Sequence, residues 1–110
     1  MIDPDSVDPI PILPNADWPF DQAPNVAAVT TRQVIEQRFP SLCVTHYSDD
    51  HSWGFVCGTT DAVEDARIIG MSEALEIDPT LREVADLPPG WTARRTKVGS
   101  MWQRFHDEKV

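Results

Sequence analysis

The feature that most constrains the fold is the spacing of glycine, proline and tryptophan residues between Trp53 and Trp102. Proline lacks a backbone N–H and glycine tolerates positive φ, so both residue types mark the ends of strands and helices. Gly58 and Gly90 are expected at turns or strand ends, and Pro79 stands where a helix begins. The spacing therefore predicts a compact module of short elements, and these residue types do not form a catalytic constellation.

The 110 residues support a single domain, over residues 25–110, preceded by an extended arm over residues 1–24. The arm holds six of the ten prolines together with five acidic residues. Proline removes a backbone donor, so we expect neither a helix nor a central strand there. Apolar residues between Ile10 and Phe20 indicate that this stretch lies in extended conformation against the domain or against a partner.

The domain is predicted to be α+β, with a mainly antiparallel sheet of four or five strands. A longer helix is expected over residues 26–39, because Thr30 has capping-box spacing and Pro40 ends the apolar stripe. Asn25 is an alternative N-cap for the same helix. The chain is too short for a parallel sheet with crossover helices on both faces.

A short helix is expected over residues 79–85, with Leu81 facing inward. Strands are predicted at residues 42–47, 53–58, 67–71, 91–95 and 101–105. The residues expected to build the structural core and its turns are Tyr47, Trp53, Phe55, Gly58, Pro79, Leu81, Gly90 and Trp102.

The first two strands flank a cluster of turn formers at residues 48–51, which predicts a β-hairpin. A register that pairs residues whose numbers sum to 100 places Tyr47 opposite Trp53 and Cys43 opposite Cys57. A slip of one residue would send Trp53 and Phe55 to the other face from Tyr47. We expect the sum of 100, because it buries the larger aromatic set.

The formal net charge of −9 at pH 7 argues against nucleic acid and anionic membranes as main ligands. An acidic surface suits solubility, or attraction to a basic protein partner. The acidic residues expected to meet such a partner are Asp49, Asp50, Asp61, Glu64 and Asp65. Their spacing does not match a twelve-residue calcium loop, and a solvated turn face is the alternative interpretation. The basic residues at 94, 95, 97 and 104 are expected to pair with the acidic arm or loop.

The two cysteines and three histidines offer little chemistry by their spacing. A structural zinc needs four ligands, usually in two close pairs, and Cys57 has no nearby partner, so we expect no metal and no cofactor. Activation of Cys57 by His46 is the alternative that would make the protein a thiol enzyme or small hydrolase. The sequence starts without a secretory leader and has no run of ~20 apolar residues, which predicts reduced thiols and a cytoplasmic protein without membrane contact.

Four short motifs carry a family resemblance: Asp50-x-x-Trp53-x-Phe55-x-x-Gly58, Asp78-Pro79-x-Leu81, Leu87-Pro88-x-Gly90, and Ala93-x-Arg95 followed by Trp102. In these motifs, residues 50–104 resemble an uncharacterised bacterial domain family grouped with immunity proteins of polymorphic toxin systems. The resemblance implies a non-catalytic protein-interaction module that binds and neutralises a partner toxin. A small enzyme using Cys57 and an accessory domain of a larger assembly are the alternatives.

Overall fold

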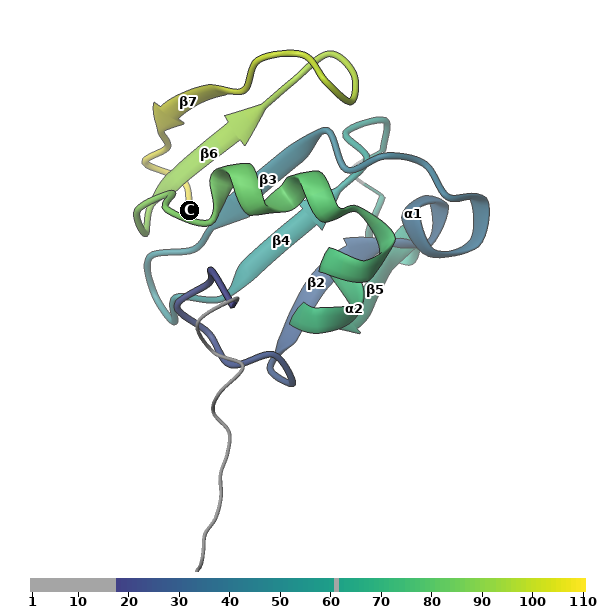
Figure 1. Cartoon of the computed structure of the whole chain (residues 1–110), viewed down its shortest axis with the longest axis horizontal. Helices are drawn as coiled ribbons and strands as arrows, with labels where there is room; N and C mark the ends of the chain where they lie inside the picture. The colour runs from purple at the N-terminus through teal and green to yellow at the C-terminus, as the bar shows by residue number, and fades with distance from the viewer. Residues whose placement is uncertain (1–17, 61) are drawn as a thin grey trace, which may run out of the picture.

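Six strands form one mixed sheet in the computed structural model, which describes residues 18–60 and 62–110 (Figure 1). The strand order is β5-β2-β4-β3-β6-β7. Among the described strands, β2 and β4 run parallel and the other neighbours run antiparallel. The bounds are β2 (Ala27–Thr31), β3 (Cys43–His46), β4 (Trp53–Val56), β5 (Ala66–Gly70), β6 (Trp91–Arg94) and β7 (Gln103–His106). The α+β class is confirmed, and the sheet is larger and more mixed than expected.

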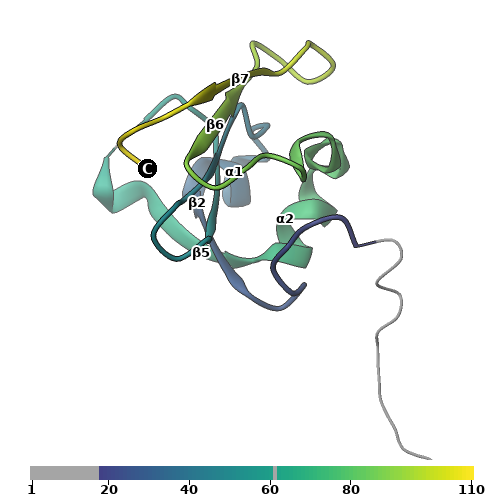
Figure 2. The same ribbon diagram turned by 90° about the vertical axis from the view of Figure 1, so that its left-hand side faces the viewer.

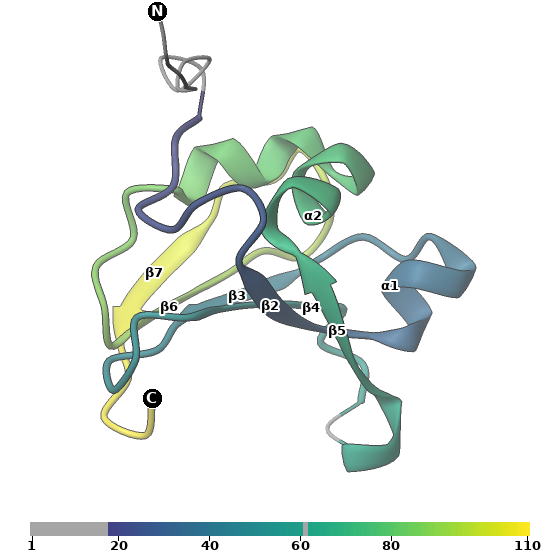
Figure 3. The same ribbon diagram turned by 90° about the horizontal axis from the view of Figure 1, so that it is seen from below.

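The helices of the described residues are α1 (Arg32–Gln37), α2 (Met71–Ile77) and the two 3-10 helices η2 (Val63–Asp65) and η3 (Pro79–Val84), of which α2 and η3 cover one face of this sheet (Figure 3). Figures 1 and 3 show α2, η3 and the segment of residues 18–26 on the same face, with α1 beside one end of the sheet. Figure 2 shows α2 on one side of the sheet and the C-terminal end on the other. We call the face under α2 and η3 the covered face and the opposite one the open face.

The hydrophobic core lies between the covered face and the layer above it. Trp53, Phe55 and Val44 supply the sheet side, and Met71 and Leu81 supply the helical side, each at most 1% exposed. The set is completed by Phe20, Ala28, Ile69, Ala74, Leu75, Val84, Leu87 and Ala93. Phe20 reaches this core from the predicted arm, so residues 18–20 pack on the domain, while residues 1–17 lie outside the described residues.

The helix predicted over residues 26–39 is wrong in its first half, which forms strand β2. Val29, Thr30 and Thr31 are β-branched, and such side chains lose rotamer freedom in a helix and fit a pleated sheet. Strand β2 pairs with β4 on one side and β5 on the other, so its backbone groups are used on both sides. The Thr30 hydroxyl also donates to the Phe55 carbonyl at 2.6 Å. Pairing across the sheet therefore outweighs the local capping pattern.

The predicted hairpin forms, but its register is wrong by one residue. His46, not Tyr47, lies opposite Trp53, and Cys43 lies opposite Val56, not Cys57. The Tyr47 N–H donates to the Ser52 carbonyl at 2.8 Å, which closes a four-residue turn and makes the paired numbers sum to 99. A one-residue slip exchanges the faces, so Tyr47 leaves the core layer and His46 enters it.

Tyr47 instead lies on the open face, half-buried over Gly54. A Cβ atom at Gly54 would lie 3.2 Å from the Tyr47 hydroxyl oxygen, so the ring occupies the space that a side chain would take. The aromatic layer of the covered face is thus Trp53 and Phe55, whose rings stack at 6.0 Å, joined by Phe20.

The other turn and helix signals agree with the structure. Strand β5 lies where the third strand was expected, and η3 begins at Pro79 with the Asp78 side chain accepting from the Thr80 N–H. Leu81 is 1% exposed, as expected of an inward residue. Gly58 and Gly90 have φ of 79° and 87°, a region that favours glycine. Within the described ranges, no helix combines the length and hydrophobicity needed to cross a bilayer.

Candidate partner-binding surface

Residues of the spaced motifs meet around the buried side chain of Arg95. Its Nη2 lies 2.7 Å from Asp78 Oδ2, and the two side chains are 0% and 9% exposed. Arg95 also donates to the Ser41 carbonyl and the Thr80 hydroxyl, and its guanidinium lies 4.2 Å from the centroid of the Trp102 ring. These contacts join strand β6, the start of η3 and the 40–42 segment. The motifs therefore build the fold and leave no free charged group at this point.

Arg94 and Arg104 also have internal partners, whereas Lys97 forms no ion pair among the described residues. Arg104 forms an ion pair with Asp86 at 2.7 Å and donates to the Glu83 carbonyl, while Trp102 Nε1 donates to the Glu83 carboxylate at 3.0 Å. The hydrogen bond from Arg104 holds the pKa of Asp86 below its ordinary value. Arg94 lies over the Phe105 ring at 5.6 Å. Internal pairing was expected, but the acids come from η3 and the turn after it, not from the arm or the 59–66 loop.

The acidic residues predicted to bind a partner lie at two ends of the sheet. Asp49 and Asp50 are exposed in the β3–β4 turn, whereas Glu64 and Asp65 follow β4 in the next connection (Figure 1). Strand β4 runs between the two connections, so these acids lie at its opposite ends. Asp61 lies outside the described residues. The sequence therefore identified exposed acids, but the structure does not gather them into one site.

Asp65 already has a partner within the chain. Its Oδ1 accepts from Arg32 Nε at 2.7 Å, and its Oδ2 accepts from the Thr60 hydroxyl at 3.0 Å. The hydrogen bond from Arg32 is the main cause of a pKa of Asp65 below its ordinary value. Asp65 thus anchors the loop after β4 to α1, and it is a poor candidate for meeting a partner.

This lowered pKa gives a testable pH dependence. Because the folded pKa of Asp65 lies below its unfolded value of ~3.9, its stabilising contribution is present above pH ~4 and is lost as the pH falls through the folded pKa. A carboxyl-detected NMR titration should place the Asp65 midpoint below ~3.9. Arg32→Met should move the midpoint upward. A midpoint unchanged by Arg32→Met would show that the Arg32 contact does not form.

Five exposed acids without an ion pair in the described ranges form the candidate partner-binding surface: Asp49, Asp50, Glu64, Glu73 and Glu76. Glu83 and Glu108 are also exposed and without an ion pair in these ranges, but the Glu83 carboxylate accepts from Trp102 and Glu108 lies in the C-terminal segment. Asp50 accepts from the Ser52 N–H within the hairpin turn, and Glu73 accepts from the Gly70 N–H at the start of α2, so both also stabilise local structure. Glu73 and Glu76 lie on α2, which the sequence left unassigned, and their role as surface acids was not predicted.

A contact between buried His46 and half-exposed Asp21 was also missed. His46 Nδ1 lies 2.7 Å from the Leu87 carbonyl, so Nδ1 carries the proton and donates. Nε2 lies 3.2 Å from Asp21 Oδ2, although not in hydrogen-bond geometry. Asp21 Oδ1 accepts from Trp53 Nε1 at 2.8 Å, and the His46 ring stacks on Trp53 at 4.0 Å. Asp21 therefore fastens the segment of residues 18–26 to the covered face.

Cys57 does not meet the base that a thiol enzyme would need. Burial raises the pKa of its thiol, but hydrogen bonds with the Thr31 and Thr59 hydroxyls outweigh burial, so the pKa lies below its ordinary value. A hollow of about 400 Å³ runs beside it, lined by no histidine or carboxylate of the described residues. His46 is committed to Leu87 and Asp21 at the other end of β4. With Cys57 at 1% exposure, the predicted Cys57–His46 pair is not assembled.

Cys43 and Cys57 are both free thiols. This agrees with the register of the hairpin, in which Cys43 lies opposite Val56 and not opposite Cys57. Within residues 18–60 and 62–110, no three His, Cys, Asp or Glu side chains are grouped closely enough to hold a metal ion. Comparison of the chain with protein-family profiles, curated protein sequences and solved structures gave no match.

Proposed function

We propose that the chain is a non-catalytic protein-interaction module of the cytoplasm that binds a basic protein partner, in the manner of an immunity protein that neutralises a toxin. The observation that carries this proposal is that some carboxylates of the described residues form internal ion pairs and others stay exposed without one. Asp65, Asp78 and Asp86 are used by arginines of the chain, whereas Asp49 and Asp50 stay exposed and without an ion pair among the described residues.

Unpaired exposed acids suit association with a basic protein for a physical reason. A negative potential attracts a positive partner over several ångströms and raises the association rate, while charges at the rim of an interface add little to the lifetime of the complex. The open hairpin turn presents Asp49 and Asp50 beyond the end of the sheet, where a partner can approach without displacing an element (Figure 1).

A charge change at the hairpin turn tests this steering. Asp49→Lys with Asp50→Asn keeps a side-chain oxygen for the Ser52 N–H and should slow association with a neutralised basic toxin by about tenfold at low salt. The salt dependence of the rate should weaken as well. Stopped-flow binding measures both, and Asp86→Asn with Glu36→Lys is the control, because it changes the net charge by the same amount on α1 and after η3, away from the turn.

Protection in cells tests the function itself. Toxins encoded beside the gene for this chain should lose toxicity when the wild-type chain is co-expressed, and the hairpin-turn variant should protect less at equal protein level. Failure to protect against any neighbouring toxin, together with a turnover activity that Cys57→Ala removes, would replace the proposal with an enzyme.

A further inference from the structure

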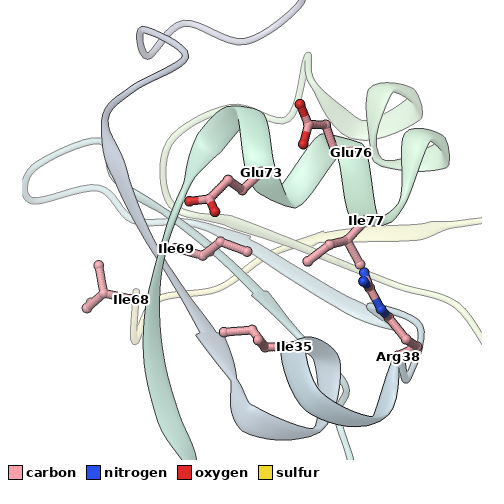
Figure 4. Close-up of a pocket in the computed structure, with 7 residues that line it drawn as sticks. All are labelled: Ile35, Arg38, Ile68, Ile69, Glu73, Glu76 and Ile77. Atoms are coloured by element: carbon pink, nitrogen blue, oxygen red, sulfur yellow. The ribbon is translucent and has the colours of Figure 1, made fainter.

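A groove lies between α1, β5 and α2 at one edge of the sheet. Its first part is a hollow of about 490 Å³ with an isoleucine floor. Figure 4 shows Ile35 of α1, Ile69 of β5 and Ile77 of α2 converging on this floor from three elements. Ile68, which is 70% exposed, lies at the rim. Within the described ranges, Ile35 and Ile77 are only partly buried, whereas Ile69 is buried at the bottom of the hollow.

The groove continues past Arg38 and Ile77 into a second hollow of about 310 Å³, since both residues line the two hollows. The second part is also apolar, with Phe39 at 40% and Val98 at 49% exposure. Exposed large hydrophobic residues next to a hollow are typical of interaction sites. A first hollow with both charged and apolar lining residues, joined to a second that is mainly apolar, therefore fits an extended segment better than a small compact molecule.

The charges of the groove indicate what kind of segment it accepts. Glu73 and Glu76 of α2 form one wall, and Arg38 stands alone opposite them (Figure 4). The chain's own residues 1–17 carry four aspartates and no basic residue, so this wall repels them. A second copy brings a net charge of −9 and the same two glutamates, so it is repelled too.

Arg38 brings one positive charge to the groove. It ends α1 with φ of 58°, the left-handed conformation that commonly closes a helix. Its position beside the isoleucine floor puts a guanidinium within the groove, where it can bind a carbonyl or carboxylate of an incoming chain.

We propose that this groove binds a segment of a partner protein in which basic and large apolar side chains alternate. The apolar side chains fill the floor formed by Ile35, Ile69 and Ile77, and the basic side chains meet Glu73 and Glu76. This inference rests on the proposed function, because it names the part of a basic partner that the module holds.

Short labelled peptides in which Lys and Leu alternate test the groove with the full chain. Fluorescence anisotropy should show saturable binding, and Glu73→Gln with Glu76→Lys should weaken it by about tenfold, the change expected when close charge pairs are removed. Gln at position 73 keeps the acceptor for the Gly70 N–H, so the variant should fold. Ile68→Ser, at an exposed rim position, should also weaken binding. Asp86→Asn with Glu108→Lys controls for net charge, because neither residue lines the groove.

Peptides in which Glu alternates with Leu, or Lys with Ser, should bind at least about tenfold more weakly. Equal binding of either peptide, wild-type affinity in the groove variants, or a dimer of the chain that these variants dissociate would overturn the proposal. If a toxin is neutralised but the groove variants protect fully, the groove proposal fails and the proposed function stands. If the groove binds the Lys–Leu peptide but no toxin is neutralised, the proposed function fails and the groove stands.

Discussion

Asp78→Ala is expected to lower the free energy of unfolding by about 3–5 kcal/mol, because it leaves the Arg95 guanidinium buried without its carboxylate. The same change removes the acceptor of the Thr80 N–H at the start of η3. Urea unfolding followed by tryptophan fluorescence measures the loss. The effect should be cooperative, with an unchanged dependence on denaturant.

Two controls separate this pair from ordinary surface charges. Asp86→Ala removes the exposed partner of Arg104 and should cost about 1 kcal/mol or less. The double variant Asp78→Ala with Arg95→Met should be less destabilised than Asp78→Ala alone, because no unpaired charge is then buried. Equal losses in the free energy of unfolding for Asp78→Ala and Asp86→Ala would contradict the claim that the buried Arg95–Asp78 pair holds the fold together.

Trp53→Ala is expected to cost about 3–5 kcal/mol, as for other large buried aromatic residues. The Trp53 side chain is fully buried, packs on Phe20 and His46, and donates to Asp21. Calorimetry or urea unfolding should show the loss. Phe105→Ala on the open face, at 37% exposure, should cost about 1 kcal/mol. Similar losses at the two positions would mean that the covered face is not the core.

The sequence was sufficient for elements whose ends carry their own chemistry. Proline and aspartate at the start of η3, and glycine with positive φ at residues 58 and 90, act locally, so their signals can be identified in the sequence. Strand β2 was missed because its stability comes from β4 and β5, which lie far along the chain. The hairpin register was missed because the prediction chose the pairing that buries the most aromatic residues. The length of the turn decides the register instead, since four residues between Tyr47 and Ser52 make the paired numbers sum to 99.

For the candidate surface too, local features could be predicted from the sequence and long-range contacts could not. Exposure of Asp49 and Asp50 could be predicted from a cluster of turn formers, which is a local property. The Arg95–Asp78 and His46–Asp21 contacts join residues 17 and 25 positions apart through packed elements, so no spacing rule identified them. The groove depends on three elements meeting at the sheet edge, and only the folded chain brings them together.

The central claim is that the spaced motifs mainly build the fold while exposed acidic residues, which share only Asp50 with these motifs, bind a basic protein. The most direct measurement is an amide chemical-shift map of the isotope-labelled chain titrated with the alternating Lys–Leu peptide. The account predicts shifts concentrated at Arg38, Ile68–Ile77 and Val98, with weaker changes at Asp49 and Asp50. Shifts concentrated instead around Cys57, Thr59 and Arg94, or spread over the open face, would contradict it.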